Sequence, residues 1–160
     1  MSTPTPPSQL TGYGSLLPAE AVVLREWLRQ HEKEYDRFDF NVRIGSGTDP
    51  GPNYPDYVRQ GAIKNTQRRI DAIGWRGNQA TLIEVKSRAS FNAMGQLLGY
   101  RQLWIADNPT LPEPILLLVA QSTAPNVREV AMSHKMGMDL VDVDLSQFFP
   151  GATSQGGTHE

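Results

Sequence analysis

The sequence predicts an α/β domain in which helices flank a mixed central sheet. Three observations predict this class. Apolar residues recur at helical spacing after Pro18. A Gly77-Asn78 turn joins two short apolar runs, a pattern typical of an antiparallel hairpin. Residues 115–119 are all apolar and precede a helical pattern and a last apolar segment, which indicates a strand–helix–strand crossover. The predicted order is αβββαβ with a further αβ.

The amino-terminal half is expected to hold one helix and one strand before the hairpin. Residues 1–15 are rich in Pro, Ser and Thr and are expected to form a flexible leader. Pro18 suits the first turn of a helix over residues 18–33. A strand is expected at 38–44. Residues 45–67, dense in Gly, Pro, Asn and Asp, are expected to be a long connection without regular structure, functional or mobile.

The carboxyl-terminal half is expected to complete the sheet. Its elements are predicted at residues 90–106 (helix), 115–119 (strand), 125–136 (helix) and 140–143 (strand). Gly137 is the expected C-cap of the second of these helices, and His134 is expected to pack on its apolar face. Residues 16–148 then form a single domain, and 149–160 a flexible tail.

The hairpin brings three charged residues to one patch of the sheet. With a two-residue turn, paired residue numbers sum to 155, so Asp71 lies directly opposite Glu84. Lys86 projects on the same side as Glu84 because side chains alternate along a strand. A slip of one residue would instead send Asp71 to the other face and leave ordinary surface charges.

Opposed carboxylates need an explanation. They destabilise a strand pair by roughly 0.2–1 kcal/mol where exposed, and by more where water is excluded. A divalent cation between them reverses that sign, and hard oxygen ligands suit Mg²⁺ or Mn²⁺. The pattern therefore predicts a metal site at Asp71 and Glu84.

Composition excludes several classes of protein. The 160 residues, 39% of them hydrophobic, fit one globular domain. The absence of cysteine excludes disulfides, thiolate zinc sites and iron–sulfur clusters. No apolar run approaches the roughly 18–20 residues that cross a bilayer, and the amino terminus has no signal-peptide pattern. We expect an intracellular or virion setting and no membrane partner.

Positive charge clusters around the hairpin, although the net charge is −2. Residues 37–101 hold ten Lys/Arg against five Asp/Glu, whereas the remainder holds five against twelve. A positive surface around a carboxylate pair suits a polyanion approaching a bound metal, and the alternative is ordinary surface charge. The candidate nucleic-acid-binding residues are Arg59, Lys64, Arg68, Arg69, Arg88 and Arg101.

The element order and these motifs resemble the PD-(D/E)XK nuclease superfamily over residues 16–145. Asp71 and Glu84-Val85-Lys86 match the second and third motifs. Gln96 and Tyr100 follow on one face of the next helix, and a Gln-x-x-x-Tyr pair there resembles RecB-type nuclease domains and related phage recombination exonucleases. Glu20 corresponds to their helix-one acid, and the start of the chain is also similar to Holliday-junction resolvases of this superfamily.

The resemblance implies a restriction-endonuclease-like core and a metal-dependent nuclease that hydrolyses DNA phosphodiester bonds. Asp71, Glu84 and the Val85 carbonyl would hold Mg²⁺ (or Mn²⁺), which binds the scissile phosphate and a water. Glu20 either holds a second metal, directly or through water, or only complements the helix dipole. DNA is the implied partner, in a phage or mobile-element recombination, repair or DNA-processing pathway.

The resemblance implies roles for three further side chains. Lys86 would orient or activate the water and balance charge on the phosphate. Gln96 would fix the substrate or the hairpin backbone, and Tyr100 would hydrogen-bond a phosphate or Lys86. The alternative for both is packing alone.

Two alternatives stay open. Pro55-Asp56 also supplies an aspartate ahead of Glu84, although hairpin geometry favours Asp71. The fold could also serve as a structural or interaction module of a larger, phage-like assembly. A homo-oligomer or such an assembly is therefore a further expected partner, located in the host-cell cytoplasm or the virion if the chain is phage-encoded.

Overall fold

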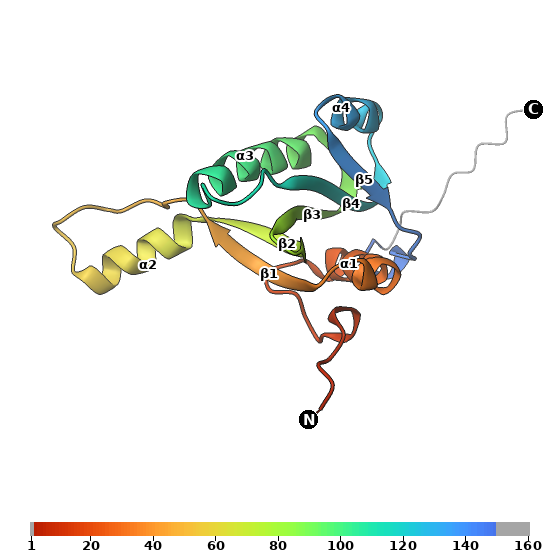
Figure 1. Ribbon diagram of the computed structural model, residues 1–160, viewed down its shortest axis with the longest axis horizontal. Helices are drawn as coiled ribbons and strands as arrows, with labels where there is room; N and C mark the ends of the chain where they lie inside the picture. Colours follow the sequence, from red (N-terminus) through yellow and green to blue (C-terminus); the bar gives the residue numbers. More distant parts are fainter. Residues whose placement is uncertain (1, 150–160) are drawn as a thin grey trace, which may run out of the picture.

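The computed structural model describes residues 2–149 (Figure 1). Its helices are α1 (Pro18–His31), α2 (Asp56–Thr66), α3 (Phe91–Asp107) and α4 (Val127–Ser133). Its strands are β1 (Arg37–Ile44), β2 (Arg68–Arg76), β3 (Gln79–Ala89), β4 (Ile115–Thr123) and β5 (Met136–Leu140). Short 3₁₀ helices occur at Pro7–Gln9, Glu32–Glu34 and Ser146–Phe148. Apart from Phe149, the tail expected at 149–160 lies outside the described residues.

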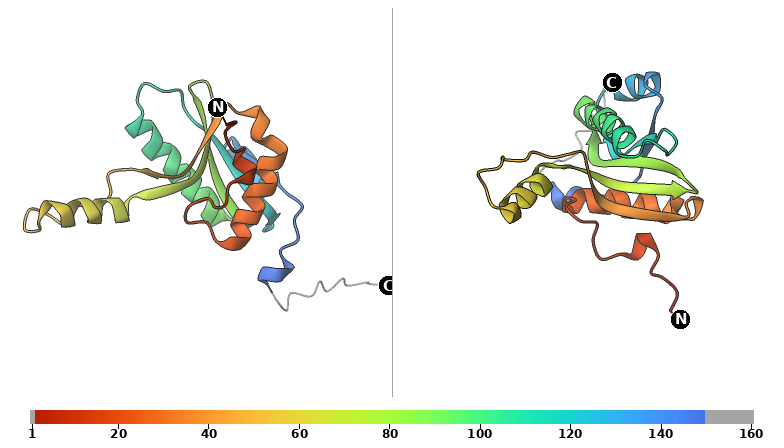
Figure 2. Two further views of the ribbon diagram at one scale, coloured as in Figure 1. Left: turned by 90° about the horizontal axis from the view of Figure 1, so that it is seen from below. Right: turned by 60° about the vertical axis from the view of Figure 1, so that its left-hand side comes forward.

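The five strands form one mixed sheet in the order β1-β2-β3-β4-β5. The pairs β1–β2 and β2–β3 are antiparallel, whereas β3–β4 and β4–β5 are parallel. Helices cover both faces, α1 on one and α3 with α4 on the other (Figures 1 and 2). This confirms the predicted α/β class with a mixed central sheet flanked by helices.

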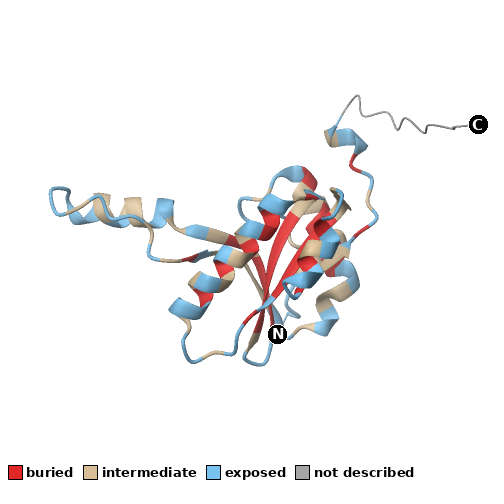
Figure 3. Cartoon of the chain, turned by 90° about the horizontal axis from the view of Figure 1, so that it is seen from above, coloured by how far each residue is buried: buried red, intermediate tan, exposed pale blue. Residues whose placement is uncertain are grey.

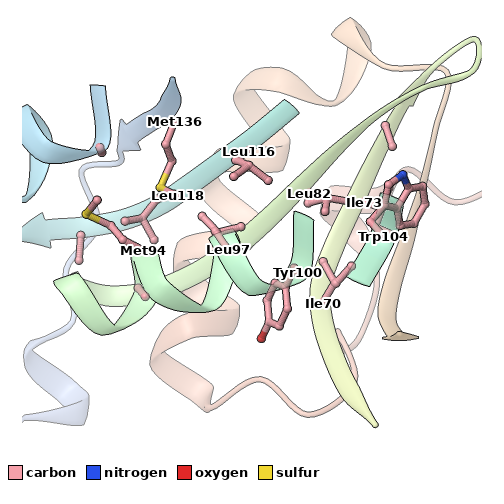
Figure 4. Close-up of a cluster of buried hydrophobic side chains, with 14 of the residues drawn as sticks. Ile70, Ile73, Leu82, Met94, Leu97, Tyr100, Trp104, Leu116, Leu118 and Met136 are labelled. Carbon is pink, nitrogen blue, oxygen red and sulfur yellow. The ribbon is translucent and has the colours of Figure 1, made fainter. Parts of the chain in front are cut away.

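Each face of the sheet has its own apolar layer. Under α3, side chains such as Leu97 and Trp104 pack against strand residues such as Leu82 and Leu118 (Figure 4). Under α1, Val23, Leu24, Trp27 and Leu28 are at most 1% exposed. These positions recur at helical spacing, which explains why Pro18–His31 folds as an amphipathic helix. The helix α3 begins at Ser90, whose Oγ accepts a hydrogen bond from Ala93 N.

The β1–β2 pair changes faces midway along its length. Phe40 and its partner Ala72 pack in the α1 layer, whereas Val42 and its partner Ile70 pack in the α3 layer. Regular strands keep residues two apart on one face, so alternation breaks between these pairs. Asn41 occupies the break with φ = 54°, a conformation that asparagine tolerates better than most residues. Its Oδ1 accepts a hydrogen bond from Ser15 Oγ.

Within the expected leader, residues 7–13 contact α1. Ser8 donates two hydrogen bonds to the Glu32 carboxylate, from its backbone nitrogen and its hydroxyl. Tyr13 is 3% exposed in the α1 layer. Along the described part of the chain, none of the helices is both long and apolar enough to cross a membrane.

The expectation that residues 45–67 lack regular structure is wrong, because α2 occupies half of this segment. Pro55 precedes its first residue, and Asp56 and Lys64 complement the helix dipole at its two ends. None of its residues is fully buried, and the helix projects away from the body (Figures 1 and 3). Without a buried stripe, the sequence carries no strong helical signal here.

Two boundaries near the carboxyl end also differ from expectation. The helix α4 is shorter than residues 125–136, and the left-handed residue after it is Lys135, not Gly137. Gly137 lies instead in β5, where an added Cβ would come 3.2 Å from Leu117 Cδ1. The strand therefore precedes the predicted 140–143, and His134 is exposed at the end of α4 instead of packed.

Candidate active site

The site lies where β2 and β3 separate. The two strands pair from Arg76↔Gln79 as far as Ala72↔Ile83, in the register predicted from the turn. Beyond that point β3 continues to pair only with β4, and β2 only with β1. Asp71 occupies the fork, and its Oδ2 accepts a hydrogen bond from Val85 N at 2.8 Å. The Asp71 side chain thus takes the place of the next backbone hydrogen bond between β2 and β3.

Glu84 and Lys86 complete the cluster from β3. The Glu84 side chain is almost fully enclosed, with the residue 2% exposed. Its Oε1 lies 3.1 Å from Lys86 Nζ. Its Oε2 is buried without a hydrogen-bond partner among residues 2–149. A buried carboxylate oxygen of this kind is expensive to leave unpaired, which is consistent with an electropositive ligand.

Burial and mutual repulsion disturb the titration of the acid pair. Burial, reinforced by the charge of Asp71, raises the pKa of Glu84 to about 8. Burial also raises the pKa of Asp71, with a further contribution from Glu20, against the hydrogen bond from Val85. Burial opposes the charged form of Lys86, but the nearby carboxylates, Glu84 first, raise its pKa above the ordinary value. At neutral pH the metal-free pair therefore retains a proton.

Glu20 approaches this cluster from α1. Its charge acts on the pKa values of both Asp71 and Lys86. Its Oε2 also accepts a hydrogen bond from Leu17 N at 3.2 Å, as in a capping box. Both interpretations of this residue are thus compatible with its position, a helix cap within electrostatic reach of the acid pair.

Gln96 and Tyr100 lie one turn apart on α3 and line a groove. The groove has a volume of about 400 Å³ and also contacts Arg68, Asn92 and Leu103. The Tyr100 ring packs beside Ile70, and its hydroxyl points away from the apolar cluster (Figure 4). Burial and the charges of Glu84 and Asp71 raise the pKa of Tyr100. Gln96 Oε1 is buried without a partner within the described chain.

The predicted cationic residues differ in their surroundings. Arg59 binds Asp49 through two hydrogen bonds, and Arg101 lies 4.0 Å from Glu113. Arg68 lines the groove with Tyr100. Lys64 and Arg88 are exposed on α2 and β3, respectively.

Arg43 is a cationic residue that the sequence did not single out. It pairs directly with Arg69 across β1 and β2. Like charges in direct opposition destabilise a strand pair, so this pair favours a polyanionic ligand. Only the β1–β2 register reveals this pairing, and the register could not be predicted from the sequence because a long connection separates the two strands.

The alternative aspartate lies far from this arrangement. The side chain of Asp56 is 96% exposed at the start of α2 and lies 3.6 Å from Arg59. Asp71, not Asp56, is therefore the residue that faces Glu84 in the fork.

The residues present fit a hard divalent cation. No group of three or more His, Cys, Asp or Glu side chains gathers anywhere in residues 2–149. Mg²⁺, however, is commonly held by one or two carboxylates together with waters and substrate phosphates. Asp71 and Glu84 supply those carboxylates, and the unpartnered Glu84 Oε2 supplies a buried lone pair.

Comparisons with known proteins reveal only distant structural similarity. No family model and no curated protein matches the sequence. A chain of the EndoMS–dsDNA complex is similar in structure, with a TM-score of 0.47 and 13% identity over 82% of this chain and 48% of that one. A protein of unknown function, AF1548, is similar with a TM-score of 0.38 and 13% identity, over 74% of this chain and 56% of that one. The chain thus spans about half the length of these proteins.

Proposed function

We propose that the chain is a Mg²⁺- or Mn²⁺-dependent nuclease that hydrolyses DNA, of the RecB-type branch of the PD-(D/E)XK superfamily. One observation carries the proposal: a buried acid pair sits beside Lys86 in a strand fork, with one Glu84 oxygen unpartnered. A structural module gains nothing from repelling carboxylates at this position. The nuclease domain would span residues 16–148.

The metal would be held by Asp71, Glu84 and the Val85 carbonyl. When bound, it would polarise the scissile phosphate and lower the pKa of the attacking water. The acid pair would have to lose its proton for the metal to bind, because a carboxylate ligand must be ionised. The hydrogen bond from Val85 N holds the Asp71 carboxylate in the fork.

The remaining residues position the substrate and its charge. Lys86 Nζ, 3.1 Å from Glu84, keeps its proton and would donate a hydrogen bond to the phosphate or the water. Gln96 would donate a hydrogen bond from its amide group to the DNA backbone, from the groove wall. Tyr100 keeps its hydroxyl proton because of its raised pKa, so it would act as a hydrogen-bond donor and not as a base.

Cleavage assays test this function. The purified protein, with Mg²⁺ or Mn²⁺, should cut DNA as duplex, single-stranded or branched oligonucleotides. Asp71→Asn and Lys86→Ala should each lower the rate by several orders of magnitude while the circular dichroism spectrum is unchanged. Asp56→Asn is the matched control, since it removes the other candidate aspartate from an exposed site, and it should cut like the wild type. Equal cleavage by Asp71→Asn and wild type would remove the assignment.

A further inference from the structure

The segment between β1 and β2 forms a projecting arm, defined here as residues 45–67. It comprises a loop and α2, and none of the α2 residues is fully buried. The helix continues away from the body beyond the start of β2, and its surface is exposed or half-buried throughout (Figures 1, 2 and 3). Asp71 follows four residues after the arm ends, so the base of the arm lies close to the acid pair and its tip lies farther away.

Polar contacts hold the arm in a defined shape. Arg59 donates hydrogen bonds to both carboxylate oxygens of Asp49, at 3.0 and 2.5 Å. Thr48 N donates to Thr66 Oγ1 at 2.6 Å, and Gln67 Nε2 donates to the Gly45 carbonyl at 2.7 Å. The loop is therefore fastened to the helix from near its tip to its base, without an apolar core.

Two aromatic side chains are exposed at the tip. Tyr54 is 52% exposed and Tyr57 is 80% exposed, with only Pro55 and Asp56 between them. Exposed tyrosine rings offer flat faces on which unpaired bases stack, whereas the bases of a duplex are already stacked on each other. The tip therefore suits a single strand better than a duplex.

The base of the arm is cationic. Four residues, the basal cations, lie there: Arg43, Lys64, Arg68 and Arg69. Within residues 2–149 none of them lies within 4.0 Å of a carboxylate. The two acidic residues of the arm, Asp49 and Asp56, both lie against Arg59. The path from tip to acid pair thus carries unneutralised positive charge, which favours a polyanion over a protein partner.

We propose that the arm binds a single-stranded segment of the DNA substrate. Tyr54 and Tyr57 stack on unpaired bases, and the basal cations follow the backbone towards Asp71. The chain takes nine helical steps and five extended steps from Tyr57 to Asp71, so the span is at most about 30 Å. At the rise of about 3.4 Å per nucleotide of a B-form strand, 30 Å corresponds to roughly nine nucleotides, and a more extended single strand covers it with fewer. The position of the stacked bases relative to a cut rests on the proposed function, whereas the binding itself does not.

Binding in EDTA tests the arm without requiring cleavage. The probes are a 20-nucleotide oligothymidylate and a blunt 20-base-pair duplex, titrated by fluorescence anisotropy. The double variant Tyr54→Ala/Tyr57→Ala should lose about 10- to 100-fold in affinity for the single strand, or about 1.4–2.8 kcal/mol, and less than about threefold for the duplex. Tyr54→Phe/Tyr57→Phe should bind like the wild type, because stacking needs only the ring. Phe149→Ala, which removes an exposed aromatic elsewhere, is the matched control.

Three results would overturn the proposal. They are an unchanged affinity for oligothymidylate, an equal loss for strand and duplex, and a wild-type dimer that becomes a monomer in the double alanine variant. Sedimentation velocity measures the last, which would assign the arm to contacts between copies. If the protein binds through Tyr54 and Tyr57 but cuts no DNA with Mg²⁺, the arm proposal stands and the nuclease assignment fails. With cleavage established, 2-aminopurine is placed in turn at positions up to roughly nine nucleotides from the cut, and at least one position should be quenched with the wild type but not with the double alanine variant.

Discussion

Replacing Glu84 with glutamine should stabilise the metal-free protein while it removes metal binding. The pKa of Glu84 rises from 4.5 to about 8 in the folded state. For an acid with a raised folded pKa, the contribution to stability is fully present below 4.5 and is lost as the pH rises to about 8. Between pH 4.5 and pH 7 the wild type therefore loses about 3 kcal/mol of its free energy of unfolding, at about 1.4 kcal/mol per pH unit. A glutamine side chain does not ionise, so the variant does not lose this stability as the pH rises.

The net gain is smaller because the neutral amide oxygen of glutamine is a weaker partner for Lys86 than a carboxyl group that is partly ionised. The Lys86 side chain is 29% exposed and can be hydrated, so this loss is about 1 kcal/mol or less. Glu84→Gln should therefore gain about 2 kcal/mol at pH 7, which raises Tm by about 4–8 °C for a chain of this length. Its advantage over the wild type should vanish as the pH falls below 4.5, where Glu84 becomes protonated in both the folded and the unfolded state.

Thermal and urea unfolding in EDTA, at several pH values from about 3.5 to 9, measure this difference. Glu129→Gln is the matched control, because Glu129 is exposed on α4 and its replacement should leave the pH dependence unchanged. A Glu84→Gln protein that is less stable than wild type at pH 8, or that keeps the wild-type pH dependence, would refute the reasoning. Such a result would mean that Glu84 is comfortably ionised in the fork and needs no metal.

Three further outcomes test the site and its frame. Mg²⁺ binding at pH 7 should release close to one proton, because Glu84, with a pKa of about 8, is mostly protonated at that pH. Calorimetry in buffers of different ionisation enthalpy measures the number of protons released. A binding heat that is the same in all buffers would contradict this prediction. Lys86→Met should slow cleavage by about 10²- to 10⁴-fold with little change in Mg²⁺ affinity, and a rate within tenfold of wild type would exclude Lys86 from the chemistry. Asn41→Ala should lower the free energy of unfolding, measured in urea, by about 1–2 kcal/mol. Asn41→Gly should lower it less, because alanine is strained at φ = 54° and glycine is not. Equal losses in the two variants would show that the hydrogen bond from Ser15 matters instead.

Local signals predicted the hairpin and its register well. Gly77 has φ = 57°, as its turn requires, and the strands pair as the two-residue loop dictates. The helices α1 and α3 bury regular apolar stripes, so periodicity placed them within a few residues. These elements are determined by residues close in sequence.

Features that depend on distant contacts could not be predicted in this way. The helix α2 buries no residue fully, and the Gly- and Pro-rich loop before it resembles an unstructured connection. The opposition of Arg43 and Arg69 depends on a register set across 23 intervening residues of loop and helix, 45–67. The replacement of a ladder hydrogen bond by the Asp71 side chain likewise has no sequence signature.

The change of faces along β1 and β2 has a consequence for how the acid pair assembles. Ile70 and Ala72 hold Asp71 from opposite apolar layers, so neither layer alone fixes the direction of its carboxylate. We expect that a chain with only one of the two layers formed would leave Asp71 free to turn away from Glu84. The proposed metal site would then require both layers, and metal affinity that appears during refolding would report the docking of the second helix.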